Sequence, residues 1–560
     1  MPRDRRPFFI LPLAALIAVV PLLFRGCSCG HDYDFHIINW FEAARQLTHG
    51  TLYPHWASTP AWNAGEPRFV FYPPLSWLIG AVLGLVMPWT WTPIAYTWIA
   101  LTAAGLALYY AVRSYASPNA ALVAAAIYLT NPYILYTAYE RTAYAELLAA
   151  AWLPLALHAV LQKRVTIPAV ALPIALLWLT NAPAAVMGCY AMAFIVLIRL
   201  ALPHKKDRGG TSALRLALNS TAGALLGLGL AAFYLLPAAY ERRFVQIHFA
   251  ILPGLRPWDN FLFQHTTDPE HDVVLRSASA VALILMALTA LALVWIRSAS
   301  IRHDAGGTQS DSSEYSTAPH QLITLVLVAL AILFMLTPLS EPLWRYLPEF
   351  RFLQFPWRLL AVLGTVFGIA LARALSRTPL RGGLTAIVCA TVFALPSYYA
   401  LHEFCYPEDT VPERLAVFHS ANPGTDPTDE YTPTTADNDS LSQSNPGYWL
   451  ASSPDASPPP SSVPGPAPLQ LDLSPAAPAT LILNLRNYPA WQITRNGSRI
   501  SIRLPRKDGL ISIPLDAGPA HIKITYAMLP DQRFGYLLTA FSVMLYAVLL
   551  LRNRRATQTY

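Results

Sequence analysis

The sequence predicts an all-α polytopic membrane protein that carries a small extracytoplasmic β-sandwich near its C-terminus. The 560 residues are 54% hydrophobic and only 13% charged, which is about half the charged fraction of an ordinary soluble domain. Apolar runs of span length recur along the chain. Short alternating segments, typical of antiparallel strands, follow near the C-terminal end. This composition excludes a soluble enzyme, a disordered chain and a nucleic-acid-binding protein, although the net charge is +7.

The first apolar run, Pro7 to Phe24, follows a basic start and precedes no small-residue cleavage site. We therefore expect an uncleaved first span. Further apolar runs lie at 74–90, 92–112, 119–136, 144–162, 166–181, 184–203, 215–236, 277–297, 320–337, 357–376, 382–400 and 535–551. The run Leu75 to Val86 is short, and counting it as a span breaks the alternation of loops across the bilayer. We expect about 12 or 13 spans in all.

Lys and Arg gather in one set of connections, namely 162–164, 204–208, 297–302, 377–381 and the tail after 551. Positively charged loops of membrane proteins stay in the cytoplasm. This pattern predicts a multi-pass membrane protein with both termini in the cytoplasm. The longer loops then lie outside. The expected organisation is a membrane domain 1–400 with a first extracytoplasmic loop 25–73, a Pro/Ser-rich loop and linker 401–468, a β-sandwich 469–530 and a final span 535–551.

Apolar and polar residues alternate in several short segments of the expected sandwich, namely 480–485, 491–494, 500–504, 510–513 and 521–526. Asn496-Gly497 between two of them favours a tight hairpin. The five Cys predict no disulfide framework. A metal site formed by Cys27, Cys29 and His31 is a weak alternative. The chain carries no G-x-x-x-x-G-K-[ST], no H-E-x-x-H and no CxxC pair.

Acidic and aromatic residues alternate directly after the first span, where Tyr33 and Phe35 separate Asp32, Asp34 and His36. In an extended segment the two carboxylates and the imidazole share one face. In a helix, Asp32 and His36 share a face and Asp34 does not. Two acids at this spacing suit a divalent cation such as Mg²⁺ or Mn²⁺, or a general base. The alternative is a solvated loop with an aromatic anchor.

Glu146 lies just inside an otherwise apolar helix that continues to Leu161. Ionisable residues inside a membrane are costly and mark candidate functional sites. Arg141, five residues earlier, either pairs with Glu146 or binds a phosphate with both arms of its guanidinium. The alternative is a helix start with snorkelling side chains.

Three arginines, Arg345, Arg351 and Arg358, stand at a predicted outer membrane boundary. Positive side chains are more usual on the inner side. An anion on the outer face, such as a lipid phosphate, accounts for them. The alternative is a belt of aromatic and basic residues at the interface.

Motifs of the first loop resemble those of membrane glycosyltransferases with the GT-C fold, in particular the bacterial membrane 6-pyruvoyl-tetrahydropterin synthase-related domain family. The motifs are Asp32-Tyr33-Asp34-Phe35-His36, Gly50-Thr51-Leu52-Tyr53-Pro54, Gly65-Glu66-Pro67 and Phe71-Tyr72-Pro73-Pro74-Leu75. The stretches 141–146, 350–358 and 425–433 also match, as does a β-domain before a last span. The resemblance covers most of the chain through short motifs.

This resemblance implies transfer of a hexosyl or pentosyl group from a polyprenyl-phosphate donor on the outer face of a bacterial cytoplasmic membrane. The acceptor is then a glycan, a lipid or a protein. The resemblance implies catalytic roles for Asp32, Asp34 and His36, with Asp32 and Asp34 as candidate metal ligands. The expected substrate-binding residues are Glu66, Tyr72, Arg141, Glu146, Arg351 and Arg358. The alternatives are a lipid or glycolipid transporter or flippase, and a non-catalytic envelope assembly protein.

Overall fold

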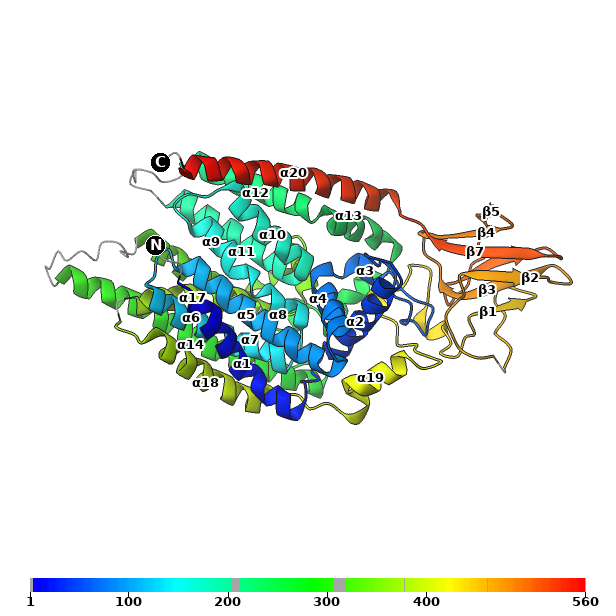
Figure 1. The fold of residues 1–560 in the computed structure, drawn as a ribbon, viewed down its shortest axis with the longest axis horizontal. Helices are drawn as coiled ribbons and strands as arrows, with labels where there is room; N and C mark the ends of the chain where they lie inside the picture. Colours follow the sequence, from blue (N-terminus) through cyan, green and yellow to red (C-terminus); the bar gives the residue numbers. More distant parts are fainter. Residues whose placement is uncertain (1–3, 203–211, 306–318, 377, 461, 559–560) are drawn as a thin grey trace.

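The computed structural model describes residues 4–202, 212–305, 319–376, 378–460 and 462–558 (Figure 1). The predicted basic connection 204–208 and Arg377 lie outside these residues. The helices of the first half are α1 Pro7–Arg25, α2 Tyr33–Thr48, α3 Arg68–Phe71, α4 Pro74–Val86, α5 Thr92–Val112, α6 Pro118–Leu129, α7 Pro132–Tyr139, α8 Tyr144–Ala149, α9 Trp152–Leu161, α10 Ile167–Thr180, α11 Ala182–Ala201, α12 Ala213–Leu230 and α13 Ala232–Glu241. The later helices are α14 Pro269–Ala305, α15 Pro319–Met335, α16 Glu341–Tyr346, α17 Leu360–Leu375, α18 Gly382–Leu401, α19 Val411–Phe418 and α20 Pro530–Gln558.

Within the described residues, ten helical segments are long and apolar enough to cross a membrane, and the count is 11 if the bent pair His320–Met335 and Pro338–Tyr346 forms one span. The expectation of about 12 or 13 spans was higher because two apolar runs form shorter helices, α4 and α10, of 13 and 14 residues. A helix of 13 residues is about 20 Å long, short of the ~30 Å hydrocarbon core. The chain is thus a helical, multi-pass membrane protein with a small β region.

The helices form one bundle, and the β-strands lie beyond one end of it (Figure 1). α1 begins and α20 ends at the opposite end of the bundle. The sandwich and the two chain ends therefore lie at opposite ends of the helical bundle. This arrangement agrees with termini that share one side of the membrane, while the compartment that each side faces stays a prediction.

The β region consists of two antiparallel sheets, with the strand orders β1-β3-β6 and β2-β7-β4-β5. The strands are β1 Tyr448–Ala451, β2 Gln470–Leu473, β3 Ala479–Arg486, β4 Trp491–Arg495, β5 Ser498–Ile500, β6 Leu510–Leu515 and β7 Ala520–Tyr526. Asn496 and Gly497 have positive φ angles of 50° and 82° between β4 and β5, as the predicted hairpin requires. β1 lies within the expected linker, so the sheets begin before residue 469.

β3 is buried on both of its faces, which explains how the sandwich is attached to the membrane domain. Leu481, Leu483 and Leu485 pack into the core between the sheets. Ile482, on the other face, packs in a second cluster with Ala61 and Ala64 of the first loop. The sandwich therefore contacts the first loop, 25–73, directly.

A buried amide completes this attachment. Asn484 is 0% exposed and donates to the carbonyl oxygens of Trp62, at 3.1 Å, and of Gly465, at 2.9 Å. We predict that Asn484→Ala lowers the free energy of unfolding by about 1–3 kcal/mol, because two buried acceptors lose their donor. Thermal unfolding in nanodiscs measures this. Thr525→Ala, on an exposed position of β7, is the control, and an equal loss in both variants would contradict the predicted role of Asn484.

Candidate functional site

The segment between α1 and α2 carries Asp32, and Gly30 allows this segment to lie close to the backbone at Glu140. A Cβ at Gly30 would lie 1.8 Å from the carbonyl oxygen of Glu140, so only glycine allows this approach. The backbone N–H of Asp32 then donates to the carbonyl oxygen of Arg141 at 2.9 Å. Thr142 follows with a φ of 46°, a conformation that costs about 1–3 kcal/mol and is held by surrounding structure. The first loop and the turn after α7 are thus locked together.

Four charged side chains from three distant segments meet at this point. Arg141 contacts Asp32 Oδ2 at 3.2 Å and Glu146 Oε2 at 2.7 Å. Arg358 Nε lies 3.6 Å from the same Glu146 oxygen. Tyr133 donates its hydroxyl to Glu146 Oε1. Glu146 thereby holds both guanidinium groups, and we call Asp32, Arg141, Glu146 and Arg358 the charged cluster.

Asp32 differs from the rest of the charged cluster in being open. Its side chain is 41% exposed, whereas those of Arg141 and Glu146 are 5% and 3% exposed. Burial raises the pKa of Asp32, but Arg141, with His36 and Arg358, outweighs that effect and holds the pKa below its ordinary value. Within the described residues Asp32 Oδ1 has no hydrogen-bond donor. Asp32 is therefore an ionised carboxylate with one oxygen available.

His36 lies one helical turn after Asp32 on α2 and is 2% exposed. Burial, assisted by Arg141, lowers the pKa of His36 to about 4 despite the nearby Asp32. Its ring makes edge contacts with the rings of Tyr72 and Tyr144, with centroids 5.9 and 5.3 Å apart. His36 is thus a neutral imidazole at physiological pH.

A cavity of about 1150 Å³ begins at the charged cluster. Asp32, His36, Tyr72 and Arg358 line its polar end together with Arg141 and Glu146. Its other end is lined by α12 and α20, through a set that we call the apolar wall: Ala222, Leu225, Leu226, Leu228, Gly229, Leu538, Phe541, Ser542 and Leu545. Leu225 and Phe541 are also 65% and 59% exposed, and both lie on helices that are apolar enough to cross a membrane. One cavity therefore connects a charged site to the apolar side chains of two candidate spans.

Asp34 does not join the charged cluster. Because α2 begins at Tyr33, Asp34 lies on a different face from Asp32, as the helical alternative predicted. Its carboxylate pairs with Arg414 of α19, whose Nε lies 3.0 Å from Asp34 Oδ1. Arg414 also bonds Asp409 at 2.8 Å. Asp34 is outside the lining of the cavity and fastens α19 to α2.

Two predicted substrate-binding residues also lie away from the cavity lining. Glu66 is 1% exposed and accepts from Arg68 Nε at 2.7 Å and from the backbone N–H of Thr428 at 3.0 Å. Arg351 is exposed, and its guanidinium lies 5.0 Å from the Phe352 ring centroid. Glu66 therefore holds Arg68 and the backbone at Thr428 in place, and Arg351 faces outward.

The expected cation shared by Asp32 and Asp34 does not fit this geometry. The two carboxylates pair with different arginines, Asp32 with Arg141 and Asp34 with Arg414. Glu146 has both oxygens occupied, and two guanidinium groups make the neighbourhood of Asp32 unfavourable for a further cation. Among the described residues, the side chains whose ligand atoms lie close enough together to hold one metal ion are those of Cys27, Cys29 and Cys405.

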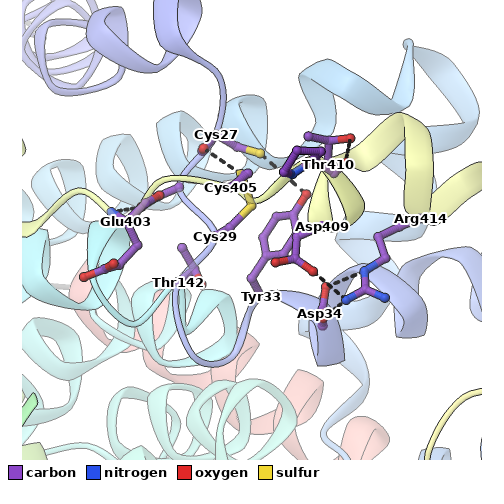
Figure 2. The surroundings of a disulfide bond; sticks show 12 residues. Cys27, Cys29, Tyr33, Asp34, Thr142, Glu403, Cys405, Asp409, Thr410 and Arg414 are labelled. Carbon is purple, nitrogen blue, oxygen red and sulfur yellow. Dashed lines mark hydrogen bonds and ion pairs between the residues drawn. A yellow bond between two sulfur atoms is a disulfide. The ribbon is translucent and has the colours of Figure 1, made fainter. Parts of the chain in front are cut away.

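Those cysteines include a disulfide that the composition did not predict. Cys29 and Cys405 are bonded across 376 residues of sequence, and Cys27 lies beside them (Figure 2). Figure 2 also shows Asp34 facing Arg414 and Asp409 on the neighbouring segment. The disulfide joins the first loop to the 401–468 segment three residues before Asp32. Two predicted extracytoplasmic segments thus share a bond that is typical of oxidising compartments.

The apolar wall and the 425–433 segment were not identified as parts of the site from sequence. Thr428, Glu430 and Tyr431 line the cavity. The only sequence signal for them was the match of 425–433 to the motifs of the resembled family. The sequence did not reveal the apolar wall, because its residues are of the same apolar types as those of any membrane-spanning helix.

No known protein family and no curated protein matches the chain. Among solved structures, it is similar to the arabinofuranosyltransferase AftD from mycobacteria, determined by cryo-electron microscopy, with 18% identity over 71% of this chain and a TM-score of 0.41. A mutant of AftD gives 17% identity over 70% of this chain and a TM-score of 0.43. The chain spans 27% and 28% of the length of these two neighbours.

We predict that acid destabilises this site through His36. The unfolded chain protonates the imidazole near pH 6.5, whereas the folded protein keeps it neutral down to about pH 4. The contribution of neutral His36 to the free energy of unfolding is therefore complete above pH 6.5, and it is lost as the pH falls toward 4. Between pH 7 and pH 5 the loss is about 2 kcal/mol.

The measurement is thermal unfolding of nanodisc samples at both pH values. His36→Gln should show a shallower dependence on pH than the parent protein. His49→Gln, at the exposed end of α2, is the matched control. Equal pH dependence in the parent and His36→Gln would refute the assignment.

Proposed function

We propose that this protein is a membrane glycosyltransferase that moves a sugar from a polyprenyl-phosphate donor to an acceptor hydroxyl in the cell envelope. One observation carries the proposal. A single cavity joins an exposed carboxylate and two buried arginines to an apolar wall open toward the lipid. A lipid-linked sugar phosphate has the same sequence of parts, namely an apolar chain, a phosphate and a sugar.

The basic part of the charged cluster suits the donor phosphate. Arg358 Nε is buried and has no hydrogen-bond partner among the described residues. Arg141 stands beside it, held by Glu146 at 2.7 Å. As the bond between the sugar carbon and the phosphate oxygen breaks, negative charge grows on the leaving phosphate. Fixed guanidinium groups at that position stabilise the transition state.

Asp32 suits the acceptor. Its free Oδ1 accepts the proton of the attacking hydroxyl as the new bond to the sugar carbon forms. Arg141 keeps the carboxylate ionised and oriented, so Asp32 is ready to act as a general base. His36, neutral and packed on Tyr72, supports the start of α2 without adding a charge. No step requires a metal ion at Asp32 and Asp34.

The same cavity also suits a lipid transporter or flippase, which needs lipid access but no catalytic carboxylate. The charged cluster gathers at one end of the cavity beside the first loop. Transporters, in contrast, place such groups near the bilayer midplane between repeated halves. This position favours catalysis at a membrane surface over passage through the membrane.

We predict that Asp32→Asn reduces sugar transfer by about 10²- to 10⁴-fold, because the base is lost while the shape of the site is kept. The readout is mass spectrometry of envelope glycans and lipid-linked sugars in a deletion strain that carries each variant. Asp34→Asn is the matched control and should retain transfer within a few-fold, since Asp34 faces Arg414. Parental glycan levels in Asp32→Asn would exclude this mechanism.

We also predict that Ala222→Trp raises the KM for the donor, because an indole at the apolar wall occupies space meant for the lipid chain. The increase should be larger for a long-chain donor than for a short-chain synthetic one. Leu218→Trp, on an exposed position of the same helix outside the cavity lining, is the control. Identical KM values in the parent and both variants would show that the chain lies elsewhere.

A further inference from the structure

The cavity has a second polar surface, formed by Thr428, Glu430 and Tyr431 of the segment 425–433, which we call the roof segment. It is held by hydrogen bonds from the first loop: the Trp62 N–H donates to the Thr425 carbonyl and the Thr425 N–H donates to the Thr59 carbonyl, at 2.9 and 3.0 Å. Arg68 donates to the Thr428 hydroxyl at 2.8 Å. The roof segment is therefore a fixed part of the site rather than a loose linker.

The far end of the roof segment is fixed as well. The N–H of Gln246 donates to the Thr432 carbonyl at 2.9 Å, and Val245 forms a β-bridge with Pro433. The Tyr431 ring stacks on Phe71, with centroids 5.5 Å apart and an angle of 13° between the rings. Aromatic surface and polar groups are thus placed together at this side of the cavity.

Glu430 is the charged group of this surface. Its side chain is partly buried, it lines the cavity, and burial raises its pKa. Within the described residues no other residue donates a hydrogen bond to the carboxylate, and the charges that act on it are those of Glu66, Arg68 and Asp429. The Glu430 carboxylate therefore faces the cavity with its oxygens free to accept hydrogen bonds from a ligand there.

The distribution of charge decides which part of a ligand binds here. Arg141 and Arg358 at the charged cluster attract phosphate, whereas Glu430 repels it. A sugar ring offers hydroxyl donors for a carboxylate and an apolar C–H face for an aromatic ring. Thr428, Glu430 and the aromatic pair Phe71 and Tyr431 offer both kinds of contact.

We propose that Thr428, Glu430 and Tyr431 form a subsite for a hydroxyl-bearing sugar ring, in which the Glu430 carboxylate accepts hydrogen bonds from two sugar hydroxyls. The proposal rests on the proposed glycosyl transfer and assigns the sugar side of that reaction to the roof segment. Glu430 is a specificity residue, because a site built to bind a hydroxyl discriminates against analogues that lack it.

The test uses the full-length protein in nanodiscs and a panel of methyl hexopyranosides and methyl pentofuranosides, titrated by saturation-transfer NMR. Inorganic phosphate, followed by phosphorus NMR, is the separate probe of the arginines. We expect the parent protein to bind at least one glycoside. Glu430→Gln should weaken that binding by about tenfold, the size of one charge-assisted hydrogen bond, and leave phosphate binding unchanged.

Asp426→Asn, which removes a charge from an exposed position of the same segment, is the matched control and should bind as the parent does. If Glu430→Gln does not fold, Glu430→Asp keeps the charge but shortens its reach, and it should lose affinity several-fold. Absence of glycoside binding by the parent, or equal affinity in a folded Glu430 variant, overturns the subsite. Failure of the proposed transfer is distinguishable, because it shows as unchanged envelope glycans in the Asp32→Asn strain.

Discussion

A buried guanidinium, that of Arg141, is the interaction on which the site depends. A charge taken out of water is costly unless it is paired, and Arg141 is paired on both sides, with Asp32 and with Glu146. One partner comes from the segment after the first span, and the other comes from the helix that follows Arg141 itself. The pairing therefore joins the first loop to the helical bundle, and it sets which carboxylate faces the cavity. Arg358 shares Glu146, so the second positive charge is fixed by the same constraint.

Much of the fold was predictable, because the rules that produce it are local. Apolar runs become helices in a membrane since no other open structure satisfies their backbone, and all the expected runs are helical. The Asn496-Gly497 hairpin followed from the φ angles that those residues tolerate. Helix lengths were less predictable: α4 and α10 are short because proline and turn residues limit them, which hydropathy does not record. β1 was missed because four residues within a proline-rich stretch give no alternation by themselves.

The site was predictable in part. Asp32, His36, Tyr72, Arg141, Glu146 and Arg358 were expected and line one cavity, because charged residues near a membrane have few alternatives to meeting one another. Asp34 was expected beside Asp32, but the start of α2 at Tyr33 turned it toward Arg414. Glu66 and Arg351 were expected at the substrate, although one is engaged by Arg68 and the other faces outward. Arg414 pairs with Asp34 across 380 residues of sequence, and no local pattern reveals such a pairing. Glu430 lies in a segment that only its resemblance to the family motifs singled out.

The Cys29–Cys405 bond has a consequence for biogenesis. Its two sulfur atoms leave the ribosome 376 residues apart, so the link closes only after nearly all membrane helices have been inserted. Until then, the segment that carries Asp32 lacks its covalent brace, and the chain that supplies the roof segment does not yet exist. A partly synthesised chain thus holds its charged residues without a complete site. Completion of the site therefore waits for the C-terminal part of the chain, which supplies Cys405, the roof segment and the α20 side of the cavity.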